Sequence, residues 1–329
     1  MPRHLSAALM LIALVSRAGA ETPADVKIAV APDKATVAFS IGNDEVARYH
    51  IGPAVAKPYF WPLLAPGQVK VTRAWPMEKG APKESVDHVH QKSAWFCHGD
   101  VIPEGVTVVP SSDKHVKGVD FWSEGKGHGV IAGVAVSVTG NVLTTKNEWR
   151  DAAGTKLLDE TRVITLTMVS GGRLFAFDIT LIASVCPLTF GDTKEGSFGV
   201  RVNDQMTLKA KDTKNALVNA DGKSGEAGVW GMLSDWCDYS GEVDGRLAGV
   251  AIFDDPKNPS RAGWHSRGYG LMAANPFGRK ASGFPGRKGA EDLVKLLKGE
   301  SLTLRYGLYL HDGDAKSGKV ADAYQAFVK

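Results

Sequence analysis

The sequence predicts an all-β protein, a large antiparallel β-sandwich with one or two short helices near its C-terminus. Three observations carry this prediction: short runs in which apolar and polar side chains alternate, turn-forming residues between those runs, and a scarcity of the helical period. The 37 glycines among 329 residues suit many tight turns. Together these features favour sheets packed face to face around one core.

The expected strands begin with a meander of three short runs. In the first two runs apolar residues recur at every second position, which is the strand period, as in Val26, Ile28 and Val30. Turn pairs such as Gly171-Gly172 and Asp312-Gly313 separate the later runs. The predicted strands are residues 26–30, 37–41, 45–51, 130–138, 163–169, 174–182, 246–253 and 302–310.

Two segments have helical features. Residues 290–298 have acids in the first turn, place Leu293, Leu296 and Leu297 on one face, and stop at Gly299, so a helix is predicted there. A second short helix is predicted over residues 319–327.

The first twenty residues have the order of a secretory signal peptide. Arg3 and His4 precede an apolar run over residues 5–15 and a small-residue end that finishes at Ala20. The run is too short for a spanning helix, which needs about 20 apolar residues, and no later window approaches that length. We therefore expect cleavage after Ala20, a periplasmic or secreted location, and a single β-sandwich domain over residues 21–329.

Composition and motifs exclude several function classes. The formal net charge is +3 and no dense basic block occurs, so nucleic acid and anionic membranes are not expected partners. Walker, G-x-S-x-G, H-E-x-x-H and strand-linked G-x-G-x-x-G motifs are missing, and no cofactor is predicted. Cys97, Cys186 and Cys237 form no CxxC pair and are interpreted as small buried side chains, with one disulfide or three free thiols both open.

The first candidate site segment is Asp87-His88-Val89-His90. On an extended strand, His88 and His90 would share a face because residues two apart point the same way. Two imidazoles on one face suit acid–base chemistry on an oxygen-rich ligand. A divalent metal is a second interpretation, although spacing supplies no third ligand.

Two further segments place charges among glycines and aromatic rings. Asp120 and Trp122 together suit sugar recognition, where a ring stacks on C–H faces and a carboxylate accepts from hydroxyls. The run 191–196 holds Lys194 and Glu195, and Arg201 follows on the strand face opposite to Phe198 and Val200. A solvated turn has the same composition as this run.

The last candidates come late in the chain. Trp236 stands beside carboxylates and is predicted to be a stacking platform. His265 and Arg267 would share one face if their run is extended. A pocket that collected these groups would combine proton carriers, cations and aromatic walls.

These segments, taken in order, resemble the exported bacterial family labelled methane oxygenase PmoA, a domain of unknown function. The similarity covers about residues 50–313, but the family's third histidine, arginine and glycine after the first histidine pair are replaced by Gln91, Lys92 and Ser93. A methane-oxidising membrane subunit needs spanning helices, which the sequence lacks. The resemblance instead implies a supersandwich similar to galactose mutarotase and a sugar or sugar-derived ligand. The matching motifs are Lys57-Pro58-Tyr59, Asp87-His88-Val89-His90, Gly118-Val119-Asp120-Phe121-Trp122, Glu148-Trp149, Gly191-Asp192-Thr193-Lys194-Glu195-Gly196, Trp230-Gly231, Asp238-Tyr239-Ser240-Gly241 and His265-Ser266-Arg267-Gly268-Tyr269-Gly270.

The leading hypothesis is an exported carbohydrate-active enzyme, a hydrolase, lyase or epimerase, that works by general acid–base catalysis. A non-catalytic carbohydrate-binding protein and a metal-dependent oxidoreductase built on the first histidine pair are the alternatives. The predicted catalytic residues are His88, His90, Glu195 and His265. The predicted substrate-binding residues are Asp120, Trp122, Lys194, Arg201, Trp236 and Arg267.

Overall fold

Strands dominate the computed structural model, which describes residues 25–78, 84–210 and 214–329. The predicted signal peptide lies outside these residues. Within them, no helix combines the length and the apolar character that crossing a bilayer requires.

The first large sheet is antiparallel throughout and begins with the predicted meander. Its strands, in spatial order, are β1 (Val26–Val30), β2 (Thr36–Ile41), β3 (Asp44–His50), β4 (Tyr59–Ala65), β6 (Ala94–His98), β13 (Gly196–Arg201), β18 (Leu271–Asn275) and β17 (Gly263–Ser266), with β5 (Val69–Lys70) paired to β4.

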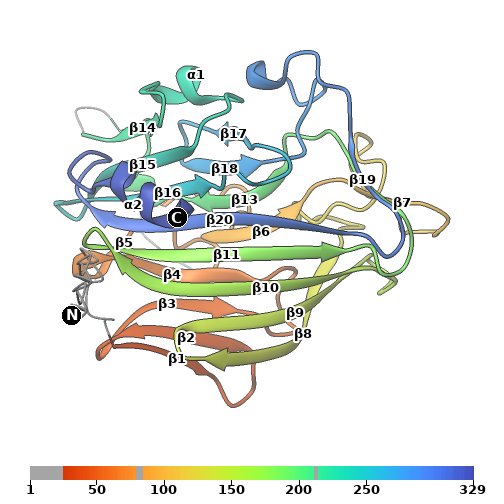
Figure 1. Ribbon diagram of the computed structural model, residues 1–329, viewed down its shortest axis with the longest axis horizontal. Helices are drawn as coiled ribbons and strands as arrows, with labels where there is room; N and C mark the ends of the chain where they lie inside the picture. Colours follow the sequence, from red (N-terminus) through yellow and green to blue (C-terminus); the bar gives the residue numbers. More distant parts are fainter. Residues whose placement is uncertain (1–24, 79–83, 211–213) are drawn as a thin grey trace, which may run out of the picture.

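The second large sheet is also antiparallel and contains the longest strands. In spatial order these are β14 (Ala216–Asn219), β15 (Trp236–Val243), β16 (Arg246–Asp254), β20 (Ser301–Asp312), β11 (Gly172–Ile182), β10 (Lys156–Val169), β9 (Val142–Arg150) and β8 (Val130–Thr139). Figure 1 shows the two sheets and, beside β16 and β20, the C-terminal helix.

A small third sheet and two helices complete the fold. The sheet consists of β19 (Val294–Leu296), β12 (Leu188–Phe190) and β7 (Val101–Pro103), and the helices are α1 (Gly225–Val229) and α2 (Val320–Val328). The predicted C-terminal helix is therefore confirmed as α2, whereas the helix predicted over residues 290–298 is wrong. Residues 294–296 pair with β12 instead, and Leu297 remains 64% exposed, so the apolar face expected of a helix is not buried together. Tertiary pairing here overrides local propensity.

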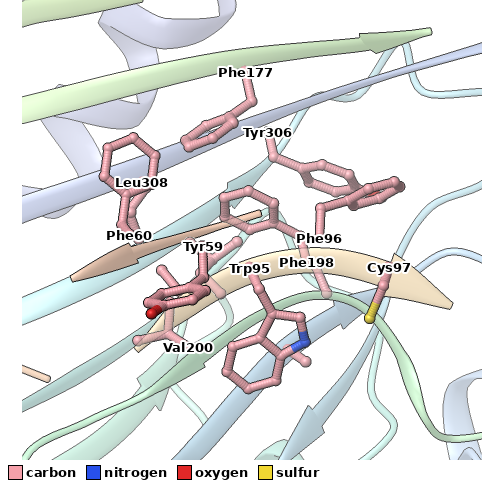
Figure 2. Packing of buried hydrophobic residues seen from close by; sticks show 14 of the residues in the cluster. Tyr59, Phe60, Trp95, Phe96, Cys97, Phe177, Phe198, Val200, Tyr306 and Leu308 are labelled. Carbon is pink, nitrogen blue, oxygen red and sulfur yellow. The ribbon is translucent and has the colours of Figure 1, made fainter. Parts of the chain in front are cut away.

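The core lies where the two large sheets meet. Phe60 and Phe198 of the first sheet contact Phe177 of the second, with ring centroids 5.9 and 4.7 Å apart. Phe198 also stacks on Tyr306 at 5.3 Å (Figure 2). These contacts confirm the predicted sandwich, because each sheet buries one face against the other.

The three cysteines are all buried and all free. Of the two options that the sequence left open, the structure therefore has three free thiols. Burial raises the pKa of the Cys97 thiol to about 12, so this side chain is an apolar filler rather than a nucleophile.

The outer face of the first sheet carries a row of directly opposed residues that leads to the site. Trp95 lies opposite Gly199, Gly199 opposite Ala273, and Ala273 opposite His265. A Cβ at Gly199 would lie 2.9 Å from Trp95 and 3.3 Å from Trp122. The small residues in the middle of the row thus leave room for the Trp122 ring, which stacks on His265 at 6.2 Å.

Candidate functional site

The cleft and its residues

A cleft with two connected chambers lies over this outer face. The inner chamber has a volume of about 320 Å³, and the outer chamber one of about 1140 Å³. Asp113, Lys194, Glu195 and Arg267 line both chambers, so the two spaces meet at these residues. The inner chamber is lined by His88, His90, Gln91, Asp113, Trp122, Ser123, Lys194, Glu195, His265, Arg267 and Tyr269.

All four predicted catalytic residues, His88, His90, Glu195 and His265, line the inner chamber. They come from a loop before β6, from the turn between β12 and β13, and from β17. Residues separated by more than 170 positions in the sequence therefore meet in one small space. Their catalytic roles stay a prediction.

The two histidines of the first segment meet for a reason other than the one predicted. Their rings are 5.7 Å apart, but His88 has a φ of 44° and a turn follows it, so the segment is not an extended strand. The His88 ring stacks on Tyr269 at 5.2 Å. A loop, not strand alternation, brings His88 and His90 together.

Two buried arginines hold this histidine loop, which we define as residues 84–91. Arg73 donates to the Asp87 carboxylate at 2.5 Å and to the His88 carbonyl at 3.1 Å. Arg201 donates to the Gln91 side chain at 2.7 Å and to Asp87 at 3.0 Å. Burial alone would raise the pKa of Asp87, but the two guanidinium groups outweigh it and hold that pKa below its usual value.

Glu195 is positioned by its backbone. Its carbonyl accepts from the Gly99 amide at 2.7 Å, and a Cβ at Gly99 would lie 2.8 Å from the Glu195 Cβ. Burial raises the pKa of Glu195, an effect that neighbouring Lys194 opposes. The carboxyl group therefore stays protonated to a higher pH than an ordinary glutamate.

Burial has the opposite effect on the imidazoles. It lowers the pKa of His265 to about 3, with Arg267 adding to the effect, and it lowers the pKa of His90 to about 3, with Lys57 adding to it. Both rings are neutral at ordinary pH and accept a proton only with difficulty. The chamber thus combines a carboxyl group of raised pKa, that of Glu195, with the neutral imidazoles of His90 and His265.

Aromatic rings form the walls around His265. The Trp230 ring lies edge-on to it at 5.1 Å, and the Arg267 guanidinium lies 3.6 Å from the centroid of the Trp230 ring. Arg267 also pairs with Glu226 at 3.0 Å. Stacking and the ion pair together fix where the Arg267 charge lies.

Predicted residues placed elsewhere

Three of the predicted substrate-binding residues do not line the cleft. The Asp120 carboxylate accepts from the Trp122 and Ser123 amides at 2.8 and 3.0 Å, so it anchors the loop that carries Trp122. Arg201, 1% exposed, holds the histidine loop instead of facing the cleft. Trp236 packs in the separate apolar cluster beside α2, so it has no part in this cleft.

Sequence reasoning assigned no role to Gln91, Asp113, Ser123 and Tyr269, which also line the inner chamber. Tyr269 lies in a turn after β17, so strand alternation gives no signal for its place in the chamber. Asp113 lies in an exposed polar loop, whose composition gives no such signal. In the described part of the chain, no three His, Cys, Asp or Glu side chains are grouped so that they would hold a metal ion.

Acid sensitivity of the buried imidazole

The neutral state of His265 predicts a loss of stability in acid. In an unfolded chain the pKa of His265 returns to about 6.5. Below that pH His265 is therefore protonated in the unfolded state but stays neutral in the folded state. At pH 5 this difference lowers the free energy of unfolding by about 2 kcal/mol relative to pH 8. His98, with its pKa lowered to about 4 by burial, acts in the same direction, and His311, with a raised pKa, acts in the opposite one.

Urea unfolding at pH 8 and pH 5 measures this effect. His265→Asn is expected to reduce the difference between the two pH values by about 2 kcal/mol. An unaltered pH difference in His265→Asn would show that His265 is protonated equally in both states.

Comparisons with known proteins

The family comparison gives one decisive match. A family model described as a family of unknown function, DUF6807, matches residues 36–325, which is most of the chain. The protein belongs to the DUF6807 family. The match does not carry the methane oxygenase PmoA designation that the motifs resemble. No functionally curated protein matches this DUF6807 member.

Several solved structures match this DUF6807 member at low identity and low TM-score. A polysaccharide lyase has 11% identity and a TM-score of 0.39, covering 92% of this chain and 34% of its own. The galactosidase domain of an α-galactosidase–sucrose kinase has 7% identity and a TM-score of 0.40, covering 88% of this chain and 42% of its own. The DUF6807 chain thus spans less than half the length of either protein.

A galactose mutarotase-like protein from Clostridium acetobutylicum is comparable to the DUF6807 protein in length. It has 9% identity and a TM-score of 0.39, with 88% of this chain and 99% of that chain covered. All three similarities concern the fold and assign no activity to the DUF6807 protein.

Proposed function

We propose that this protein is an exported enzyme that acts on a carbohydrate by general acid–base catalysis in the inner chamber. One observation carries the proposal: His88, His90, Glu195 and His265, far apart in the sequence, line one chamber of about 320 Å³. Titratable groups with perturbed pKa values that gather in a cleft are characteristic of active sites.

The environments suggest how the roles divide. Glu195, whose pKa burial raises, is the proton donor. His265, neutral because burial lowers its pKa to about 3, is a hydrogen-bonding partner of a sugar hydroxyl, and the more exposed His88 is the proton acceptor. Hydrolysis, elimination and epimerisation all need such a donor and acceptor on either side of the reacting carbon.

The aromatic and cationic groups suit the same ligand. Trp230 offers ring surface for the C–H face of a sugar, beside the exposed Lys194 and the stacked Arg267. Trp122 is fully buried and supports the His265 ring from behind. The outer chamber leaves room for a second part of the ligand, either further sugar units or a leaving group.

The test is turnover of a panel of oligosaccharides and polysaccharides, followed by ¹H NMR of the products. Once a substrate is found, Glu195→Gln and His265→Asn are each expected to lower kcat at least about hundredfold. Glu242→Gln, an exposed glutamate of β15, and His128→Asn are the matched controls and should keep wild-type turnover. If Glu195 is the donor, activity of the wild type falls as pH rises through its raised pKa.

The outcomes separate the competing functions. Full turnover in both variants would overturn the assignment. A saccharide that binds but is recovered unchanged after long incubation would instead identify a carbohydrate-binding protein. About one equivalent of metal in protein purified without added metal would favour the oxidoreductase hypothesis.

A further inference from the structure

We propose that the inner chamber binds the carboxylate of an acidic sugar between Lys194 and Arg267. This inference rests on the carbohydrate ligand proposed above and adds the charge of that ligand. It is carried by two cations with unused donors, by one unbalanced positive charge behind the chamber wall, and by the exposure of Asp113 at the rim.

Lys194 and Arg267 both line the chamber and both retain donors. The Lys194 ammonium is 3.9 Å from the Glu195 carboxylate, beyond hydrogen-bond distance, and its side chain is 48% exposed. Arg267 uses Nη1 for Glu226, and its other guanidinium nitrogens form no hydrogen bond with any residue that the structure describes. Stacking on Trp230 holds the guanidinium in place, so its free N–H groups are organised before a ligand arrives.

The wall behind the histidines adds positive charge. Lys57, 1% exposed, and Lys92 share the single carboxylate of Glu124, at 3.0 and 2.5 Å. Arg73 and Arg201 are balanced by Asp87 and by Asp204, which lies 3.9 Å from Arg201, so the excess charge of this wall comes from the two lysines. Charges in a partly buried wall are screened less than surface charges, so they reach the chamber.

The acids that face the chamber balance this charge only in part. Asp113 lies on an exposed loop at the rim, where water screens it. Glu195, 3.9 Å from the Lys194 ammonium, is the other acid of the lining. The positive charges of Arg267 and Lys194 both help to lower the pKa of His265, so both act inside the chamber. A carboxylate bound beside these cations forms charge-assisted hydrogen bonds that a neutral hydroxyl does not.

The experiment compares matched acidic and neutral sugars by calorimetry at pH 7. The probes are D-glucuronate, D-galacturonate and D-mannuronate, each against D-glucose, D-galactose or D-mannose of the same configuration. At least one acid is expected to bind about tenfold more tightly than its neutral partner. Added NaCl should weaken binding of the acidic sugar more than binding of the neutral sugar.

Variants locate the effect. Lys194→Gln and Arg267→Gln should each reduce the preference for the acid severalfold, whereas Lys194→Arg should keep it. Lys257→Gln removes the same charge from an exposed position outside both chambers and should change nothing. Thermal unfolding of each variant checks that the fold is intact.

Binding of no acid, an equal affinity for acid and neutral sugar, or an equal loss in Lys257→Gln would overturn the inference. Its failure differs from that of the proposed function. If an acidic sugar binds at Lys194 but is never converted, the result contradicts the proposed enzyme activity and leaves the charge inference intact. If a neutral saccharide is converted in a reaction that depends on Glu195, and no acidic sugar binds, the result contradicts the charge inference and leaves the proposed enzyme activity intact.

Discussion

Replacing Arg162 with methionine is expected to lower the free energy of unfolding by about 3–5 kcal/mol. Arg162 is 1% exposed and pairs with the buried Glu160 through two hydrogen bonds of 2.7 and 2.9 Å. The substitution leaves the Glu160 carboxylate in the core without its cation. Removing one member of a buried pair costs far more than the pair contributes.

The Arg162 pair also joins the two large sheets. Arg162 lies on β10 of the second sheet and donates to the hydroxyl of Tyr49, on β3 of the first, at 2.8 Å. Glu160 accepts from Asn147 and from the Trp149 indole, both at 2.8 Å. Because burial outweighs the nearby guanidinium, the pKa of Tyr49 is raised to about 12, and its hydroxyl remains a neutral partner.

Urea unfolding followed by tryptophan fluorescence measures the change. The control is Arg150→Met, which breaks the partly exposed Arg150–Glu148 pair and should cost less than about 1 kcal/mol. Adding Glu160→Gln to Arg162→Met should recover part of the loss, because it removes the unpaired charge. A cost below about 1 kcal/mol for Arg162→Met would contradict this account of the core.

The strands were predictable because their signal is local. In β1 and β2 the alternation of Val, Ile and Phe with polar or small residues reports directly which side chains face the neighbouring layer. The strand β19 was not predictable in the same way. Leu296 in it and the flanking Leu293 and Leu297 fit a helical face equally well, and only pairing with β12, about a hundred positions earlier, decides its conformation.

Composition alone does not show which aromatic residues lie at the site. Trp122 and Trp236 both stand beside aspartates, and the same argument named both as stacking platforms. Trp122 lies over Gly199 on the outer face of the first sheet, whereas Trp236 packs against the cluster beside α2. Which face a ring occupies depends on strand order, and local sequence does not encode that order.

The histidines were selected for their chemistry, which sequence does report, but their juxtaposition depends on distant partners. The histidine loop is held by Arg201, more than 110 positions away, and by Arg73. Neither arginine is distinguishable in the sequence from an exposed charged residue. Their near-complete burial is a consequence of the assembled fold.

Replacing Arg73 with methionine is expected to release the histidine loop and to lower the free energy of unfolding by about 2–3 kcal/mol. Arg73 is fully buried and donates to Ser85, Asp87 and His88, so one substitution removes most of the hydrogen bonds that cross from the segment after β5 to the loop. The loss should be smaller than for Arg162, because Asp87 is 43% exposed and water can solvate its carboxylate.

Hydrogen–deuterium exchange distinguishes this positioning role from a general loss of stability. Arg73→Met should speed exchange of the amides of residues 84–91 while those of β10 and β11, in the other sheet, stay protected. Arg73→Lys keeps the charge but not the planar fork, and should restore protection only in part. The matched control is Arg48→Met, which breaks an exposed pair with Glu45 and should leave the loop protected.

Catalysis gives a second measurement of the same contact. If His88 and His90 act on the substrate, their displacement in Arg73→Met lowers kcat even where the remaining fold is intact. Loop amides that exchange at the wild-type rate in Arg73→Met would show that Arg201 and Asp204 suffice to hold the segment. The convergence of the histidines would then rest on Arg201 of β13, on the same face of the first sheet as Gly199, and on Asp204, which accepts from the Ser85 amide.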